Sequence, residues 1–163
     1  MRASIFIIAL LVAAVLTGCG PRIPPETTRQ VTWEGEFKTL QSDPAAHKDE
    51  FVMIGGTVIK TENFENYSEI KVLQYPLDWM NRPMTDEASE GRFLVRSETF
   101  VDPETYSPGK RLTVAGRITG AEKRPIGDHL YQYPVIEGEL YKWEPRPDRR
   151  PRFHFGIGVG RTF

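Results

Sequence analysis

The one cysteine of the chain, Cys19, ends the run Leu16-Thr17-Gly18-Cys19. A leucine, two small residues and a cysteine in this order match the bacterial lipobox. In that motif the thiol is joined to a diacylglycerol, and the peptide bond before the cysteine is then cut. The small residues let the chain enter a peptidase cleft in extended form. We therefore expect a covalent lipid on Cys19; the alternative is a secreted protein with a free thiol near its cleavage site.

The residues before the lipobox have the pattern of a secretory signal. Arg2 supplies a positive charge, and residues 3–16 carry no charge and are almost entirely apolar. This run is shorter than the roughly 20 residues that a spanning helix needs. Residues 1–18 are therefore expected to be a cleaved signal peptide. Gly20 follows the cysteine where an aspartate would favour retention in the inner membrane, so we expect export to the outer membrane.

The length and charge of the chain indicate one domain without a polyanionic partner. The 163 residues include 21 Lys and Arg against 22 Asp and Glu, a formal net charge of -1. That balance gives no reason to expect a nucleic acid. The prolines between residues 19 and 30 predict an extended, lipidated tether. We expect the domain at residues 31–143 and a tail rich in proline and arginine at residues 144–163.

The hydrophobic pattern of the expected domain is that of short strands separated by turn residues. The runs are Thr57–Lys60, Glu69–Leu73, Arg92–Arg96, Arg111–Ile118 and Pro134–Tyr141. Several short strands at such spacing favour an all-β sandwich or barrel. One helix is also expected, capped by Thr32, with Phe37 and Leu40 on one face and its end before Pro44.

Glycines within the strand pattern favour a barrel over a sandwich. The pair Gly55-Gly56 is expected to mark a bulge or a sharp bend, and Gly116 to act in the same way. A small barrel, closed or partly open, needs such bends. An all-β barrel of the oligonucleotide/oligosaccharide-binding (OB) type with one short helix fits the length.

Seven motifs stand in a fixed order between residues 37 and 143. They are Phe37-x-x-Leu40-x-x-x-Pro44, Val52-Met53-Ile54-Gly55-Gly56-Thr57-Val58-Ile59, Val72-Leu73-Gln74-Tyr75-Pro76-Leu77-Asp78, Ser89-Glu90-Gly91-Arg92-Phe93, Phe100-Val101-Asp102-Pro103-Glu104-x-Tyr106-x-Pro108-Gly109, Thr113-Val114-Ala115-Gly116 and Tyr131-Gln132-Tyr133-Pro134-Val135-Ile136. In order and spacing they resemble the Slp family of outer-membrane lipoproteins, the starvation-inducible type, over about two-thirds of the chain.

The resemblance implies an outer-membrane lipoprotein whose soluble domain faces the periplasm. It implies no known catalytic activity, and it implies expression in stationary phase and stress. We therefore expect a non-enzymatic structural or binding role in the cell envelope, with the membrane and an envelope protein or glycan as partners. The alternatives are an envelope carbohydrate- or peptide-binding module and a cell-wall hydrolase.

The residues that could carry out catalysis are better explained by turns. Asp102 precedes a proline, which is typical of a turn, so its pairing with Glu104 as acid and base is not expected. Ser89 has no neighbouring base in the sequence. The three histidines lack metal-ligand spacing, so neither a metal nor any cofactor besides the covalent lipid is expected.

Aromatic residues are the remaining candidates for a binding site. Tyr75, Trp79, Tyr131 and Tyr133, with Arg92 nearby in the pattern, form the candidate set. On this type of barrel, aromatic rings provide stacking platforms for sugars or nucleic acids. The alternative is that the rings fill the core and cover strand edges.

The last residues of the chain have an apolar pattern of period two. Phe153, Phe155, Ile157 and Val159 alternate with other residues, and the chain ends in Phe163. Such a segment is expected to add to a sheet edge, contact the membrane or dock on a partner. An unstructured tail is the alternative, given the preceding prolines and arginines.

Overall fold

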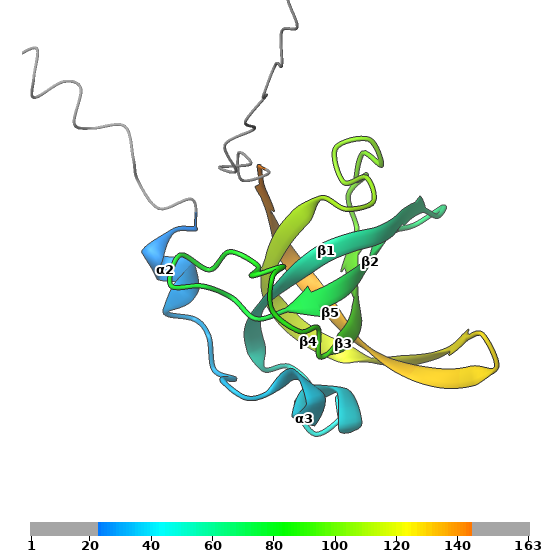
Figure 1. Ribbon diagram of the computed structural model, residues 1–163, viewed down its shortest axis with the longest axis horizontal. Helices are drawn as coiled ribbons and strands as arrows, with labels where there is room; N and C mark the ends of the chain where they lie inside the picture. The colour runs from blue at the N-terminus through cyan, green and yellow to red at the C-terminus, as the bar shows by residue number, and fades with distance from the viewer. Residues whose placement is uncertain (1–22, 145–163) are drawn as a thin grey trace, which may run out of the picture.

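The computed structural model describes residues 23–144, which are mostly β-structure (Figure 1). Two short helices come first, and five strands follow. The elements are α2 (Pro25–Thr28), α3 (Phe37–Ser42), β1 (Phe51–Asn63), β2 (Ser68–Tyr75), β3 (Gly91–Ser97), β4 (Arg111–Ile126) and β5 (His129–Trp143). Each of the five expected strand runs lies inside one observed strand. The lipobox with Cys19 and the apolar tail lie outside the described residues.

The five strands close into a barrel in the order β1-β2-β3-β5-β4. All neighbouring strands are antiparallel except β3 and β5, which run parallel and close the ring. The parallel ladder is short, and its pairs are Leu94–Val135, Val95–Ile136 and Arg96–Glu137. This order and closure confirm the expected OB-like barrel. Among residues 23–144, no helix is long and apolar enough to cross a membrane.

The barrel encloses a continuous apolar core. It is filled by alternate residues of the strands, because successive side chains of a strand point to opposite faces. Its fully or nearly buried members include Val52, Val58, Ile70, Val72, Phe93, Val95, Leu112, Val114, Ile118 and Ile136. Helix α3 covers one end of this core with Phe37 and Leu40, as the sequence predicts.

The capping residue of α3 differs from the expected one. Glu36 occupies the N-cap position and makes no side-chain capping bond. Instead, the carboxylate of Glu90 accepts a hydrogen bond from the backbone N–H of Phe37 at 3.1 Å. That contact satisfies one of the donors that a helix leaves free at its start. Thr32 lies outside the helix, where its hydroxyl accepts the N–H of Phe51 at 2.9 Å.

Gly55, Gly56 and Gly116 allow close backbone contacts rather than bulges. The ladder of β1 and β2 is regular at Gly55-Gly56, and its irregularity falls between Val58 and Lys60. The glycine pair therefore makes no bulge, whereas the sharp bend expected as the other possibility stays a prediction. Gly116 is likewise in register, facing Gly138 of β5. A Cβ atom on Gly116 would lie 2.1 Å from the carbonyl oxygen of Glu137, so only glycine fits.

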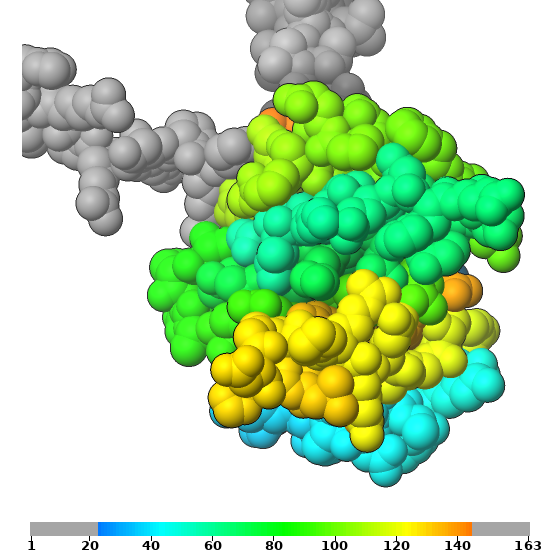
Figure 2. Space-filling model, turned by 90° about the vertical axis from the view of Figure 1, so that its right-hand side faces the viewer, coloured from blue at the N-terminus to red at the C-terminus, as the bar shows by residue number. Residues whose placement is uncertain are grey.

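Strands β4 and β5 continue past the barrel as a long hairpin. After an irregularity between Ile118 and Gly120, the two strands stay paired to the turn at Ile126–His129. Figure 2 shows this hairpin, in yellow and orange, lying over one side of the molecule. A second apolar cluster forms beneath it, made of Leu94, Tyr133 and Val135. The hairpin thus buries the outer face of β3.

A group of four charged residues also joins the hairpin to the barrel. Glu69 of β2 has only 2% of its side chain exposed, and it binds two arginines. Arg124 donates to both of its oxygens, at 2.6 and 2.8 Å, and Arg96 donates two bonds at 3.1 Å. Glu122 completes the cluster by pairing with the same two arginines. These bonds satisfy a carboxylate that would otherwise be costly to bury.

Hydrogen bonds within the cluster shift the pKa values of its groups in the direction that favours their charged forms. Hydrogen bonds to Glu122 and Glu69 raise the pKa of Arg124. The hydrogen bond from Arg124 likewise lowers the pKa of Glu122, against the opposing effect of its burial. Arg124 and Glu122 therefore remain ionised at neutral pH.

The folded domain begins earlier in the chain than the sequence predicts. Residues 23–30 were expected to belong to the tether, but they contain α2 and pack on the barrel. Ile23 is 4% exposed, and the Thr27 hydroxyl lies 3.4 Å from the hydroxyl of Tyr141 in β5. The boundary expected at residue 31 is therefore too late, because Ile23 is buried and Thr27 contacts β5.

We expect Gly116→Ala to destabilise the domain by about 2 kcal/mol, because the added Cβ atom overlaps the backbone of β5. Urea denaturation measures the change. Glu137→Ala, an exposed position on the facing strand, is the control and should cost less than about 0.5 kcal/mol. Equal stability of Gly116→Ala and the wild type would contradict the close contact.

Glu69→Gln should lower the free energy of unfolding by about 3 kcal/mol, because it leaves two partly buried arginines without their main partner. Glu122→Gln is the matched control. Its side chain is 37% exposed, so its loss should cost less than about 1 kcal/mol. A smaller effect at Glu69 than at Glu122 in thermal or urea denaturation would refute the assignment.

Candidate functional site

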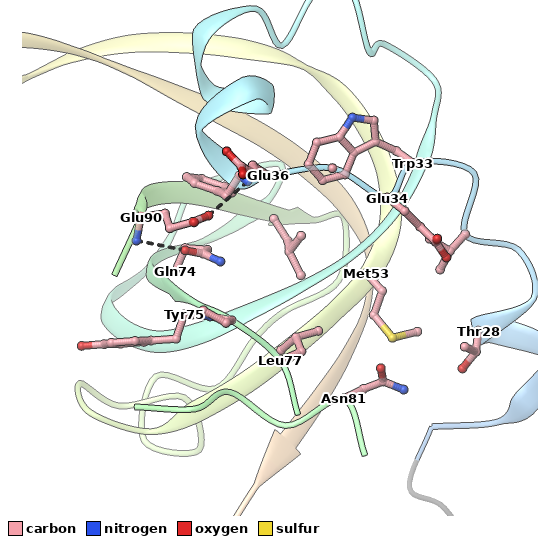
Figure 3. A pocket seen from close by; sticks show the side chains of 15 residues that line it. Thr28, Trp33, Glu34, Glu36, Met53, Gln74, Tyr75, Leu77, Asn81 and Glu90 are labelled. Carbon is pink, nitrogen blue, oxygen red and sulfur yellow. Dashed lines mark hydrogen bonds between the residues drawn. The ribbon is translucent and has the colours of Figure 1, made fainter. Parts of the chain in front are cut away.

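A cavity of about 380 Å³ lies at the end of the barrel that α3 covers (Figure 3). Its walls come from the segment between α2 and α3, from β1, and from the loop 76–90. Apolar and aromatic side chains line much of it, namely Val31, Trp33, Met53, Ile54, Tyr75 and Leu77. The volume is within the range of about 300–1,000 Å³ that is usual for small-molecule sites.

Gln74 places a free hydrogen-bond donor in this cavity. The residue is 6% exposed, and its amide oxygen accepts the N–H of Glu90 at 3.2 Å. Its amide nitrogen has no hydrogen-bond partner among residues 23–144. In Figure 3 the nitrogen points away from Glu90 and toward the space between the walls. Among residues 23–144, no buried side-chain nitrogen or oxygen lacks a partner, so this nitrogen is open to the cavity and can donate to water or to a bound group.

The charged groups that line the cavity are all acidic. Glu34, Glu36 and Glu90 belong to its lining, and no lysine or arginine does among the described residues. Asn81 adds a second amide at the edge. The site therefore offers carboxylate acceptors, amide groups and three aromatic rings, those of Trp33, Phe37 and Tyr75. It suits an uncharged or cationic ligand and disfavours an anionic one, because like charges repel across a poorly solvated space.

The loop 76–90 is held by a tight turn around Asp78. One carboxylate oxygen accepts the N–H groups of Met80 and Arg82, both at 2.9 Å, and the other accepts the Arg82 side chain at 2.9 Å. The hydroxyl of Thr113 donates to the carbonyl of Asn81 at 2.6 Å and ties the turn to β4. Asn81 itself has a left-handed backbone, with φ at 59°.

The pKa of Asp78 is lowered by this arrangement. Burial by itself would raise the pKa of the carboxyl, but the hydrogen bonds from Arg82 and Met80 have the larger combined effect. Asp78 is therefore ionised across the neutral range and acts as the anchor of the turn. It is a structural residue beside the cavity rather than a proton donor within it.

Comparison with known proteins gives the family of the chain. A model of the outer membrane lipoprotein Slp family matches residues 16–157, which is most of the sequence. The chain belongs to the Slp family. The resemblance seen in the ordered motifs is thereby confirmed, and the family is one of outer-membrane lipoproteins.

Three relatives give the extent of the similarity. An uncharacterized protein of Haemophilus influenzae is 29% identical over 129 residues, covering 78% of this chain and 69% of that protein. The lipoprotein YeaY of Escherichia coli is 29% identical over 136 residues, covering 83% and 70%. The outer membrane protein Slp of Escherichia coli is 26% identical over 97 residues, covering 60% and 51%.

A solved structure with a TM-score of 0.30 is also found, Schizosaccharomyces pombe Pot1pC bound to single-stranded DNA. It is 13% identical and covers 64% of this chain and 83% of that one. A likeness this slight carries no argument about ligand or function.

Two of the five residues expected to bind lie near the cavity of the Slp domain. Tyr75 lines it from the end of β2. Trp79 lies in the adjoining turn, where it is 88% exposed and projects from the loop rather than lining the cavity. Only Tyr75 is therefore placed to contact a ligand there.

The other three expected residues lie where the hairpin packs on β3: Tyr131 and Tyr133 belong to β5, and Arg92 belongs to β3. Tyr133 is 1% exposed and belongs to the second apolar cluster, so the structure contradicts its assignment as a binding residue. Tyr131 packs on Tyr133 at 4.7 Å between ring centroids, and its hydroxyl accepts the N–H of Arg92 at 2.6 Å. These rings hold the hairpin to β3, which is the alternative stated for the aromatic set.

The residues with catalytic side chains have structural partners. Asp102 accepts bonds from the N–H groups of Glu104 and Thr105 and from the Thr105 hydroxyl at 2.6 Å, and the hydroxyl bond lowers its pKa. The turn expected at this position is confirmed. Ser89 bonds to the backbone of Gly91. Among residues 23–144, no three His, Cys, Asp or Glu residues gather as a metal site.

The sequence did not point to the residues that define the cavity. Gln74 stands at an inward-facing position of β2, since Ile70 and Val72 are core residues of the same strand. A polar residue at the next inward position is the signal that could have identified it. Trp33 had no comparable signal, because it precedes α3 in an irregular segment.

Asp78→Asn should lower stability by about 2 kcal/mol at pH 7, because it removes the charge that holds the turn. A carboxyl with a depressed folded pKa stabilises the fold above its unfolded pKa, and this effect is lost as the pH falls through the folded pKa. The difference between Asp78→Asn and wild type should therefore shrink below the ordinary value of 3.8.

Urea denaturation at a series of pH values from neutral to acidic measures this effect, with Glu87→Gln as the control. Glu87 is an exposed carboxylate of the same loop. A difference between Asp78→Asn and wild type that stays constant with pH would contradict the role of the ionised carboxylate.

Proposed function

We propose that this chain is a lipoprotein acylated on Cys19, with its β domain in the periplasm, and that the domain is a non-enzymatic binding module for an uncharged envelope glycan. The observation that carries the binding role is the cavity with the free amide nitrogen of Gln74. Membership of the Slp family supports the anchor and the outer-membrane location.

The chemistry of the cavity supports a glycan as the ligand. Sugars present an apolar face that packs on aromatic rings, and Trp33 and Tyr75 supply such rings. Sugar hydroxyls donate to carboxylates such as Glu34 and accept from amides such as that of Gln74. A peptide would use the same amide but has less use for aromatic rings and several acceptors. Peptide binding is therefore the alternative outcome of the test.

The placement of reactive side chains supports a non-enzymatic role. Asp102 binds within its own turn, and its pKa is lowered, whereas a general acid needs a raised pKa. Ser89 and Asp102 lie in different loops of the domain, and each side chain bonds to the backbone. This distribution supports binding without chemical turnover.

The lipid anchor is tested by fractionation and by the intact mass of the mature protein. Wild type should carry acyl mass, begin at Cys19 and appear in the outer membrane, whereas Cys19→Ala should be unacylated and absent from that membrane. Soluble, unacylated wild type would contradict the anchor. The proposed link to stationary phase, which the family resemblance implies, is tested by protein abundance during growth and starvation.

Ligand binding is tested with neutral oligomers of N-acetylglucosamine by calorimetry. Gln74→Leu should weaken binding about tenfold, the value of one lost hydrogen bond. Gln30→Leu, an exposed glutamine outside this cavity, is the control and should bind as wild type does. No heat of binding with the oligomers, or equal binding by Gln74→Leu, would refute the glycan site; binding of uncharged peptides alone would favour the alternative.

A further inference from the structure

The distance between the lipid site and the folded domain is short. Only Gly20, Pro21 and Arg22 separate Cys19 from Ile23, which is buried in the domain. Four residue steps span at most about 14 Å when fully extended. If Cys19 carries the lipid, as proposed above, the domain cannot stand away from the bilayer. The surface around Ile23 and α2 must then lie against the lipid headgroups.

Because α2 is attached to the barrel, the short distance from Cys19 to Ile23 limits the position of the whole domain and not of α2 alone. Ile23 is 4% exposed, and Thr27 is 8% exposed and contacts Tyr141 of β5. The backbone of residues 24–31 is tied by successive hydrogen bonds, beginning with the N–H of Thr27 to the carbonyl of Pro24 at 3.0 Å. The barrel and residues 23–31 therefore move together.

The loop 76–90 lies beside α2 on the same part of the surface. Leu77 and Asn81 line the cavity together with Thr28 and Val31, and Figure 3 shows Asn81 and Thr28 across from each other. In Figure 1, the green loop and α2 lie on the side of the molecule away from the β4–β5 hairpin. A surface that faces the bilayer at α2 therefore includes this loop.

Trp79 projects from this loop with 88% of its surface exposed. The exposure does not come from a loose segment, because the turn of residues 78–82 is fixed by the carboxylate of Asp78 and by Thr113. Holding a tryptophan in water costs free energy, and tryptophan is the residue that favours the boundary between headgroups and acyl chains. An ordered turn that presents it outward is suited to a lipid surface.

We propose that α2 and the loop 76–90 form a membrane-contact surface, with Trp79 inserted in the headgroup region of the leaflet that holds the lipid anchor. This inference rests on the proposed acylation of Cys19. It orients the barrel, because the cavity beside Thr28 and Asn81 then lies close to the bilayer and the β4–β5 hairpin points away from it.

The test uses the acylated mature protein in vesicles of phosphatidylethanolamine with a minor fraction of phosphatidylglycerol, both with brominated acyl chains. Bromine quenches tryptophan only at close range, so fluorescence should fall relative to unbrominated vesicles. Trp79→Phe should remove more than half of this quenching, since Trp33 is half-buried and Trp143 is 7% exposed. Thermal unfolding checks that Trp79→Phe leaves the fold intact.

A relocated tryptophan is the matched control. Leu130 is 69% exposed in the β4–β5 hairpin, so Leu130→Trp in the Trp79→Phe background gives an exposed ring far from α2. That protein should show no more quenching than Trp79→Phe alone. Equal quenching in wild type and Trp79→Phe, or quenching restored by Leu130→Trp, would overturn the membrane-contact surface.

Two further measurements, flotation of the protein with the vesicles and the intact mass of the protein, which reports acylation of Cys19, separate the proposed anchor from the proposed contact surface. Protein that is acylated and floats, but whose Trp79 is unquenched, overturns the contact surface and leaves the anchor standing. Protein that is unacylated and does not float overturns the anchor, and the contact surface falls with it.

Discussion

Closure of the barrel through the parallel pairing of β3 and β5 is the constraint on which the remaining structure depends. Without it, both strands would present unpaired edges, which soluble sheets avoid. The ladder joins only three residue pairs, and the same part of β5 also pairs in register with β4. Gly116 and Gly138 face each other in the β4–β5 ladder and permit its close approach, because any Cβ atom there would overlap the opposing backbone. The glycines are therefore part of the closure itself.

Closure of the barrel also determines which segments cover its outer face and its end. Because β4 and β5 are longer than the ring requires, their remainder folds over β3 and buries Leu94 and Glu69. At one end, the connection from β2 to β3 must pass beside the segment that leads into α3. The cavity forms between these two, with Gln74 at its inner wall. The site is thus a consequence of how the ends of the barrel are covered.

Much of the fold could be predicted from the sequence, because its signals are local. The runs of β-branched residues predicted all five strands, and the spacing of Phe37 and Leu40 predicted α3. The parallel closure could not be predicted, since it joins segments that have no local mark of pairing. Tyr133 is buried because the hairpin folds back over β3. The sequence pattern of a strand does not distinguish a tyrosine on a buried face from one on an exposed face.

The candidate site was harder to predict than the fold. Its walls come from three separate segments, and its key donor is a single glutamine among apolar neighbours. The start of the domain was also misplaced, because the prolines before residue 26 are typical of a tether as well as of the first turn of a short helix. Burial of Ile23, which decides between the two, requires the barrel surface to be known.

We propose that this Slp-family barrel is held directly against the membrane with its cavity near the lipid. Neutron reflectometry of the acylated protein on a supported phospholipid bilayer measures it most directly. We expect a protein layer that begins at the headgroups, with no resolvable water layer between the protein and the headgroups. A water-filled gap wider than about 14 Å between the headgroups and the protein would contradict it, since the three intervening residues cannot span more.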